Sequence, residues 1–489
     1  MSEGTFSGNL DRNALVELGK RDPEALVDLF LGITKTLELR VTELERQLNQ
    51  DSNNSSKPPS GDGPGKIPKK RNKSRRKLGG QKGHPGQRLE PVENPDHQIE
   101  LRLDTAPSGT KVTDADIIGW EKRQIFDLPE PKLIVTEYRA AIYRDPVTGK
   151  PCHSDFPAGV NAPTGYGTGA LGLMVYFHVQ QHLPLERVGM IFSELFGQPV
   201  SDGTILKARE KVAINLEEFE EALRLVIMVQ MVLCCDETGF RVKSKQHRHW
   251  LHVMCTEQLT YYAVHDRRGA AIPEIGILPG WKQRLVHDCL SSYDAYCPDA
   301  LHCLCNPHVI RELTAVSEEG DHQAWAEDLI DFLESSNKAI KERGGERFTE
   351  EEMVPHRKRI DRIIERGKLI NPENAREGPE LKKKGRKKRT KAQNLIIRFE
   401  KRRDDYLRFM TDEYAPFSNN LAERDLRMMK LQMKISGCFR TLSGAEDFTR
   451  IRSYISTLRK NGGQIFNAIK LAVTGSPLMP EEIIRGVAT

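Results

Sequence analysis

The chain has 489 residues, of which 38% are apolar and 29% are charged, and its formal net charge is +5. This length is too great for one ordinary core and predicts about three domains joined by linkers. The longest apolar run, residues 226–235, falls well short of the roughly 20 residues that a bilayer-spanning helix needs. A membrane protein is therefore not predicted.

The N-terminal sequence MSEGTFSGNL lacks the basic start and apolar stretch of a secretory signal, which predicts a cytoplasmic protein. Its nine cysteines are then reduced. Their odd number, and the position of Cys234, Cys235 and Cys255 inside apolar runs, favour buried thiols over a disulfide framework.

The positive charge is concentrated in two stretches. Residues 57–88 hold eleven basic residues and one acidic residue, and residues 382–403 hold twelve and one. Subtracting these +10 and +11 stretches from the net charge of +5 leaves −16 for the rest of the chain. An acidic body with two basic segments suits a protein that grips a polyanion, for which nucleic acid is the natural candidate, although such runs also occur as solvated linkers.

A helical region is predicted over residues 1–50. Its apolar residues recur in steps of seven, four and three, as in a short coiled coil: Phe30, Leu37, Val41, Leu44 and Leu48. Only two to three heptads are present, so a helix packed on its own domain is an alternative to a dimer zipper.

Two further segments precede the core. Residues 51–95 are rich in Ser, Pro, Gly and Lys and cannot bury enough apolar surface to fold, which predicts a flexible basic linker. Residues 96–160 alternate short apolar stretches such as HQIELRL and KLIVTEYRAAIY with Pro and Gly, which predicts a small β-rich module.

Residues 161–222 are predicted to be helical. One helix over the stretch that contains Val188 and Phe192 breaks at Gly197, and a second begins after Ser201, a plausible N-cap. The pattern is typical of a helix-turn-helix, whose second helix enters the major groove and would present Thr204, Lys207 and Arg209 to DNA. Ordinary helix pairs with a glycine turn have the same pattern.

The core is predicted in two parts. Residues 223–317 contain strand-like runs (VIMVQMVLCCDETGF, HWLHVMC, LTYYAVHD and RLVHD) and predict an α/β fold. Residues 318–411 are polar and helical and form an insertion that carries the second basic run. Residues 412–489 return to the core and end in helices.

Two acidic residues follow apolar strands of this core. Asp236 is predicted at the end of one strand and Asp288 at the end of another, 52 residues later, so both can meet on one rim of a sheet. A carboxylate in such a place is costly without partners. Two divalent cations about 4 Å apart, held by carboxylates, can activate a water or a DNA hydroxyl and stabilise the leaving oxygen. Acids that cap loops or helices are the alternative.

A third carboxylate, Glu423, lies in SNNLAERDLRMMK, where a helix that follows Pro416 would project it across the sheet. The same residues resemble a capping box from Asn420 to Glu423, in which the glutamate only satisfies helix amides. Pattern alone therefore predicts a metal-dependent nuclease and leaves this alternative open.

Histidine and cysteine gather at His302, Cys303, Cys305 and His308, but the second Cys-x-x-Cys pair of a zinc site is missing nearby. His308, Arg311 and Glu312 have helical spacing and share one face. They would orient a phosphate or the metal ligands, or form a surface salt bridge.

Fragments along nearly the whole chain resemble the TnpC-type transposases of the IS-sixty-six group of bacterial insertion sequences. They occur in the order of that family: NSSKPP, GGQKGHPG, YGTGALGLMVYFHVQQHLPLERV, FGQPVSDGTI, DET, VHDCLSSY, CNPHVIREL, and NNLAERDLR with KISGCFRT. The family often carries cysteine pairs after the basic arm, whereas this chain keeps only Cys152 there, so the β-rich module is expected without a metal.

The resemblance implies a DDE-type transposase with a ribonuclease-H-like core in a multidomain α/β chain. Its catalytic metal ligands would be Asp236, Asp288 and Glu423, with Asp294 as the alternative second acid, holding two Mg²⁺ ions that Mn²⁺ can replace. His308 and Glu312 would support them. Contacts to DNA are expected from Thr204, Lys207, Arg209, Arg311, Arg424, Lys430, Lys434 and Arg440.

The expected partners are double-stranded DNA, as the terminal inverted repeats of the element and its target, a second copy of the chain, and accessory proteins from the same element. The expected location is the bacterial cytoplasm, at the nucleoid. Two other functions stay open: a transposase-derived DNA-binding regulator without catalysis, and a different metal-dependent nuclease that cuts branched structures.

Overall fold

The computed structural model describes residues 12–48, 89–157, 159–243, 245, 247–318, 323–372 and 389–486. The chain divides into two compact units, one formed by Met1–Gly65, Gly167–Pro184 and Ile205–Thr489, the other by Lys66–Tyr166 and Leu185–Thr204. Most of the predicted linker over 51–95 lies outside the described residues, as do residues 382–388 of the basic run over 382–403.

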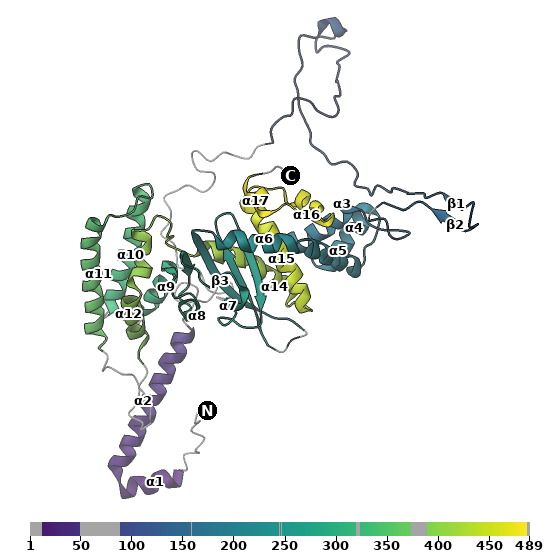
Figure 1. The fold of residues 1–489 in the computed structure, drawn as a ribbon. Coiled ribbons are helices and arrows are strands. Elements are labelled where there is room, and N and C mark those ends of the chain that lie inside the picture. Colours follow the sequence, from purple (N-terminus) through teal and green to yellow (C-terminus); the bar gives the residue numbers. More distant parts are fainter. Residues whose placement is uncertain are drawn as a thin grey trace. The chain divides into compact units, whose positions relative to one another are not determined.

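A five-stranded mixed sheet forms the centre of the first unit (Figure 1). Its strands in chain order are β3 (Val232–Phe240), β4 (His249–Cys255), β5 (Thr260–His265), β6 (Arg284–His287) and β7 (Leu301–Leu304). In space the order is β5-β4-β3-β6-β7. The first three strands form an antiparallel meander, whereas β6 runs parallel to β3 and β7 parallel to β6.

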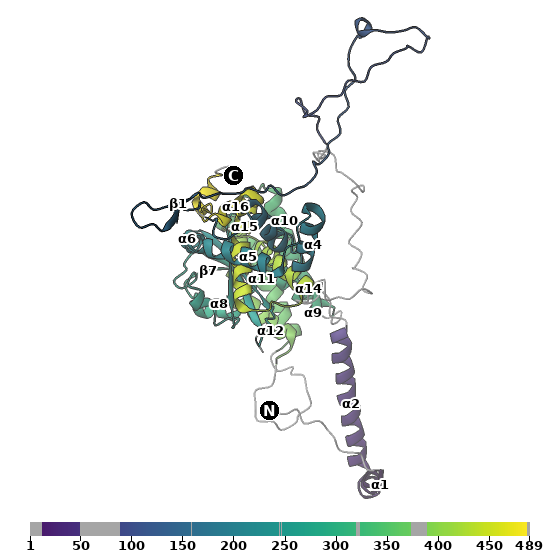
Figure 2. The same ribbon diagram turned by 90° about the vertical axis from the view of Figure 1, so that its right-hand side faces the viewer.

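Two long C-terminal helices pack on this sheet, α14 (Asn420–Ser436) and α15 (Leu442–Lys460) (Figure 2). α15 also covers the edge strand β5. The N–H of Thr260 donates to Thr457 Oγ1 at 3.2 Å, and the N–H of Tyr262 donates to Ser453 Oγ at 3.0 Å. These hydroxyls satisfy edge groups that are otherwise free to pair with another strand.

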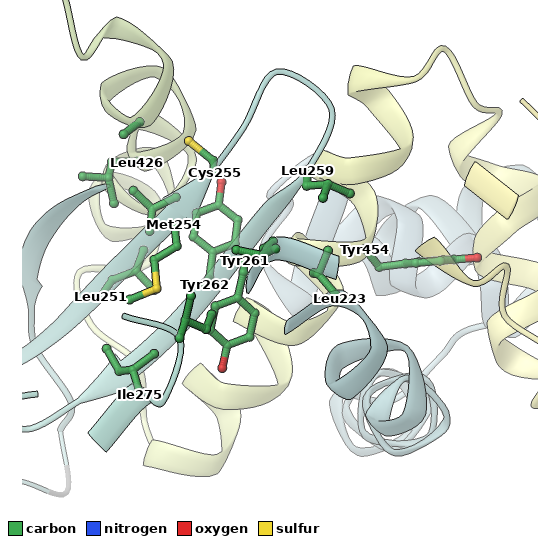
Figure 3. Close-up of a cluster of buried hydrophobic side chains, with 14 of the residues drawn as sticks. Leu223, Leu251, Met254, Cys255, Leu259, Tyr261, Tyr262, Ile275, Leu426 and Tyr454 are labelled. Atoms are coloured by element: carbon green, nitrogen blue, oxygen red, sulfur yellow. The ribbon is translucent and has the colours of Figure 1, made fainter. Parts of the chain in front are cut away.

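The apolar core lies between the sheet and its helices (Figure 3). Side chains from the strands (Leu251, Met254 and Tyr262), from α14 (Leu426) and from α15 (Tyr454) belong to this core, and all five are 3% exposed or less. The cysteines Cys234, Cys235 and Cys255 are buried free thiols in this core, as their apolar surroundings predicted.

Shorter helices complete the sheet unit. They are α3 (Thr168–Val175), the π-helical turn η3 (Tyr176–Gln180), α5 (Asp202–Asn215, whose first three residues belong to the second unit), α6 (Glu217–Met228), α7 (Ile272–Ile275), α8 (Ser291–Tyr296), α9 (Asn306–Ser317), α16 (Ile465–Val473) and α17 (Pro480–Ile484). The prediction that the strand before Asp236 starts at residue 226 was wrong, because residues 226–228 finish α6, where Ile227 is fully buried.

The predicted helical insertion lies between β7 and α14. Its elements are α10 (Ala324–Glu342), α11 (Glu350–Ile370), α12 (Lys391–Lys401), α13 (Arg403–Leu407) and η5 (Arg408–Met410). Together with α9 they enclose a second apolar core around Trp325, Phe332 and Phe399, each 1% exposed or less. A separate core explains how a long insertion interrupts the sheet domain without filling its interior.

The N-terminal part contains α1 (Arg12–Arg21) and the long helix α2 (Pro23–Leu48). Phe30, Leu37, Val41 and Leu44 of α2 are 46–59% exposed, so the apolar stripe is solvent-facing along this chain. None of the helices in the described part of the chain is long and apolar enough to span a membrane.

The second unit contains α4 (Leu185–Phe196), the short turn η2 (Asp114–Asp116) and a hairpin of β1 (Ile142–Arg144) with β2 (Pro151–His153). α4 ends before Gly197, whose φ is +66°, and the Oγ of Ser201 accepts the N–H of Thr204 at 3.3 Å, so the predicted break and N-cap are confirmed.

The predicted β-rich module over 96–160 is corrected to this single hairpin. The expected strand residues Ile99, Leu101 and Ile134 lie outside any strand and are 84–88% exposed. A lone hairpin has no second layer to bury an apolar face, so alternation of apolar residues did not suffice to form a sheet there.

Candidate active site

Asp236 lies in β3, and Asp288 directly follows the end of its parallel neighbour β6. The last pair between β3 and β6 is Cys234 with Val286, and each aspartate follows its member of that pair by two residues. Because strand side chains alternate between faces, Asp236 is directed to the face of Cys234, and Asp288 begins the loop that leaves β6 beside it. The charge of Asp288 acts on Asp236 across this short separation.

The sequence placed Asp236 at the end of its strand, and this position is corrected. β3 continues to Phe240 because Glu237–Phe240 still pairs with β4. Only the pairing with β6 stops before Asp236. Asp236 therefore lies just beyond the last residue of β3 that pairs with β6, in a part of β3 that still pairs with β4.

The first turn of α14 brings Glu423 to the same place. Asn419, which precedes this helix, donates from Nδ2 to the carbonyl of Cys235 at 2.7 Å and from its N–H to Cys305 Sγ at 3.2 Å. These two bonds join α14 to β3 and to the start of α9. The charge of Glu423 also acts on Asp236.

The capping-box alternative for Glu423 is wrong. The helix is preceded by Asn419 rather than starting from a cap at Asn420, and the N–H of Glu423 bonds to the carbonyl of Asn419 at 3.2 Å. The carboxylate oxygen Oε1 of Glu423 is buried and has no hydrogen-bond partner among the residues that the structure describes. Its side chain is thus not used to satisfy helix amides.

Burial and like charges dominate the electrostatics of the site. Burial, reinforced by the charges of Glu237 and Asp288, raises the pKa of Asp236 to about 8. Burial and the charge of Asp288 also raise the pKa of Glu237. Carboxylates that cannot all ionise together are stabilised by a divalent cation, so the donor set fits hard metal ions.

One cation partly offsets these acids. Arg268 Nη2 lies 2.7 Å from Glu237 Oε1 and 3.9 Å from Asp288 Oδ2, and the guanidinium lies 5.2 Å from the centre of the Trp250 ring. Tyr293 donates to the other oxygen of Glu237 at 3.2 Å. Arg268 could not be predicted from the sequence, because only the antiparallel meander brings it beside Glu237.

Asp294, the alternative second acid, belongs to a different cluster. Its carboxylate pairs with Arg402 and lies 3.9 Å from the ring of His302. His302 in turn is hydrogen-bonded to His287. This arrangement favours Asp288 as the partner of Asp236.

The histidines and cysteines considered for zinc separate into two places. His302 lies in the Asp294 cluster, whereas Cys305 and His308 lie beside Glu423, with ligand atoms of all three within 4.8 Å of one another. Glu312 forms an ion pair with Arg398 of α12, which ties it to the insertion. The half-buried Arg311 acts electrostatically on the Cys305 thiol.

The candidate DNA-binding residues differ in exposure. Those on α14 and after it, and Lys207 on α5, are exposed: Arg424, Lys430, Lys434, Arg440 and Lys207. Thr204 is half-buried, with its hydroxyl 3.0 Å from Ser201 Oγ. Arg209 is corrected: its side chain is only 13% exposed and pairs with Asp447 of α15 at 3.2 Å, so it fastens two helices instead of facing solvent.

Arg427, which sequence reasoning missed, extends the basic face of α14. Arg427 is exposed and follows Glu423 by four residues. Lys430 and Lys434 follow Glu423 by seven and eleven residues. Residues at these spacings lie on one side of a helix. A basic ridge therefore leads away from Glu423 along α14.

Comparison with known proteins gives a family. A family model described as "Transposase IS66 family" matches residues 164–447, which include the sheet, the insertion and Glu423. A second model, described as a family of unknown function, matches residues 17–90. No curated protein matches the chain. Because the first match covers more than half of the sequence, the chain belongs to the transposase IS66 family.

Proposed function

We propose that this transposase binds the ends of an insertion sequence and catalyses metal-dependent cleavage and strand transfer with Asp236, Asp288 and Glu423. The observation that carries the proposal is the convergence of these three carboxylates from β3, from the residue after β6 and from α14. Their sequence separations are long, so only the fold brings them together.

The sheet supports a ribonuclease-H-like assignment for the core. Three antiparallel strands are followed by two strands parallel to β3, and the acids come from the central strand, from its parallel neighbour and from a helix after the insertion.

Asp236, Asp288 and Glu423 would hold two divalent ions, Mg²⁺ or Mn²⁺. When bound, these ions polarise the phosphodiester and lower the pKa of an attacking water or 3′ hydroxyl. The protein contributes preorganised carboxylates: backbone amides orient two of them, since the N–H of Glu237 donates to Asp236 Oδ1 at 2.8 Å and that of Leu290 to Asp288 Oδ1 at 3.2 Å.

The substrate proposed is double-stranded DNA, in the form of terminal inverted repeats and target. The ridge of Arg427, Lys430 and Lys434 starts one turn from Glu423, where it would hold the backbone next to the bond that is cut. Arg268, 44% exposed and beside Asp288, is placed to contact a phosphate at the other side of the acids.

Joining two DNA ends calls for more than one active site, and we propose at least a dimer, with the exposed stripe of α2 as a zipper. Accessory proteins from the same element are further proposed partners, as is the bacterial nucleoid as the place of action.

The test is cleavage and strand transfer on labelled element-end DNA with Mg²⁺ or Mn²⁺, comparing wild type with Asp236→Asn. We expect the variant to bind the DNA with wild-type affinity and to form neither product. Strand transfer that survives Asp236→Asn would sink the mechanism, and binding without cleavage by wild type under every condition would favour a regulator.

A further inference from the structure

Two buried ligand atoms face each other beside the carboxylates without a hydrogen bond. His308 Nδ1 and Glu423 Oε1 lie 3.7 Å apart. Neither atom has a hydrogen-bond partner within the described ranges, and both are buried from solvent. Native proteins rarely leave two such atoms unsatisfied, because each loses its hydration without compensation.

A direct hydrogen bond does not account for this pair. An N–H···O bond has a donor–acceptor distance of about 2.7–3.2 Å, which is shorter than the separation observed. A metal ion with ligands at about 2.0–2.2 Å sets two neighbouring donor atoms roughly 3.0–3.4 Å apart. A closure of a few tenths of an ångström would therefore place one ion between them.

The two side chains are held in place by hydrogen bonds around the first residues of their helices. The N–H of Asn306, the first residue of α9, donates to the carbonyl of Phe417 at 3.1 Å, and its Nδ2 donates to Tyr406 at 3.0 Å. On the other side, the N–H of Asn419 donates to Cys305 Sγ. His308 and Glu423 thus project from the first turns of two helices that are fastened together.

Cys305 is the third member of the cluster with His308 and Glu423, but its sulfur already takes part in a hydrogen bond. Its sulfur already accepts the N–H of Asn419 at 3.2 Å, which joins α9 to α14. The N-terminal ends of both helices favour the negative charge of Glu423. The donors that point into the gap are therefore one carboxylate oxygen and one imidazole nitrogen.

We propose that His308 is a direct metal ligand beside Glu423, so that this end of the site takes Mn²⁺ in preference to Mg²⁺. Mg²⁺ is bound almost wholly by oxygen, whereas imidazole suits transition ions. The inference rests on the proposed function, because it assigns a donor to the same metal site. It makes the two ends of the site chemically different, one with aspartate oxygens and one with mixed donors.

The experiment uses the full chain without DNA, loaded with Mn²⁺, and detects nitrogen bound to the metal by electron spin echo modulation. His308→Asn places an amide oxygen or nitrogen near the position of Nδ1 and serves as the conservative variant, while His308→Ala removes the donor. His356→Asn, in α11 of the insertion, is the matched control.

Wild type and His356→Asn are expected to show the modulation of a coordinated imidazole, which His308→Asn loses. His308→Ala should bind Mn²⁺ at least about tenfold more weakly, with little change for Mg²⁺. Absence of imidazole modulation in wild type, or its persistence in His308→Asn, overturns the inference. If either of these results is found and wild type still cleaves DNA with Mg²⁺, the ligand assignment fails and the proposed function stands. If wild type shows the modulation but never cleaves DNA, the ligand assignment stands and the proposed function fails.

Discussion

Two clusters of similar composition lie on the parallel half of this sheet, and they differ in how their imidazole nitrogens are satisfied. His287, His302 and Asp294 form one, and Cys305, His308 and Glu423 form the other. By residue type alone, both qualify as metal sites. Their hydrogen bonds separate them.

In the first cluster every imidazole nitrogen takes part in one continuous series of hydrogen bonds. The N–H of Cys289 donates to His287 Nδ1 at 3.2 Å, so Nε2 of that ring carries the proton and donates to His302 Nδ1 at 2.9 Å. His302 Nε2 then donates to the carbonyl of Cys297 at 3.1 Å. Burial lowers the pKa of both rings, which keeps them neutral and structural.

In the second cluster the facing atoms of His308 and Glu423 are buried without partners in the described part of the chain. Asp294 Oδ1 of the first cluster is also buried without a hydrogen bond, so the two clusters differ in their imidazoles: both rings of the first are hydrogen-bonded, whereas His308 Nδ1 is not. The comparison teaches that an unsatisfied imidazole, rather than a gathering of histidines and acids, separates a candidate ligand from a structural histidine. Asp294 is distinguished from Asp288 by its ion pair with Arg402, which ties it to the helical insertion.

The largest effect on cleavage is expected when Asp288, just after β6, is exchanged for asparagine, and its control is the same exchange at Asp294 of α8. Asp288→Asn should reduce DNA cleavage at least about 1,000-fold, because bound metal stabilises the transition state by several kcal/mol. Asp294→Asn breaks the pair with Arg402 and should lower thermal stability while cleavage changes less than about tenfold. Single-turnover cleavage rates of the two variants are the measurement. A larger loss of cleavage in Asp294→Asn than in Asp288→Asn would make Asp294 the metal ligand.

A large loss of protein stability is expected when a hydrogen-bonded histidine of the first cluster is replaced. His302→Ala leaves His287 Nε2 and the Cys297 carbonyl unpaired and should reduce the free energy of unfolding by about 2–4 kcal/mol. His308→Ala, which breaks no hydrogen bond of its side chain among the described residues, should cost less than about 1 kcal/mol. Denaturant unfolding of both variants is the measurement, and equal losses would contradict the division into scaffold and site.

The pH dependence of stability should reveal the raised pKa of Asp236. Because the folded-state pKa is about 8 and lies above the unfolded value, its contribution is fully present below about pH 4 and is lost as pH rises through 8. In metal-free protein, Asp236→Asn removes this loss and should raise the free energy of unfolding by roughly 1–3 kcal/mol at pH 8, with no gain at pH 4. Melting temperatures at the two pH values test this, and a gain that is the same at both would be inconsistent with it.

The smallest effect is expected on the basic ridge of α14. Arg427→Gln should lower the affinity for DNA a few-fold and reduce the slope of log affinity against log salt by about one, since one phosphate contact is lost. Lys358→Gln, an exposed change on α11, is the matched control and should alter neither quantity. Fluorescence anisotropy at several salt concentrations gives both, and an unchanged slope for Arg427→Gln would remove it from the DNA path.

Local signals predicted much of the fold. The glycine break at Gly197 predicted the end of α4, and the cap at Ser201 predicted the start of α5. The apolar runs predicted the strands of the sheet. The segment 96–160 was misjudged because alternation describes one face of a strand but does not provide the layer that covers it.

The candidate site was predictable as a set of acids but not as a geometry. The match of Asp236 with Asp288 depends on the register of β3 and β6, and the meeting of His308 with Glu423 depends on an insertion that folds around its own core. Arg209 was assigned to DNA because its partner, Asp447, lies far along the chain and no local pattern connects them.

The central claim is that Asp236, Asp288 and Glu423 bind the metal ions that cut DNA, and a metal-specificity switch at Asp236 tests it most directly. Asp236→Cys replaces a hard oxygen donor by sulfur, so cleavage of element-end DNA should be lost with Mg²⁺ and recovered in part with the more thiophilic Mn²⁺ or Cd²⁺. The account predicts this exchange of metal preference with DNA binding unchanged. Full activity of Asp236→Cys with Mg²⁺ would contradict it.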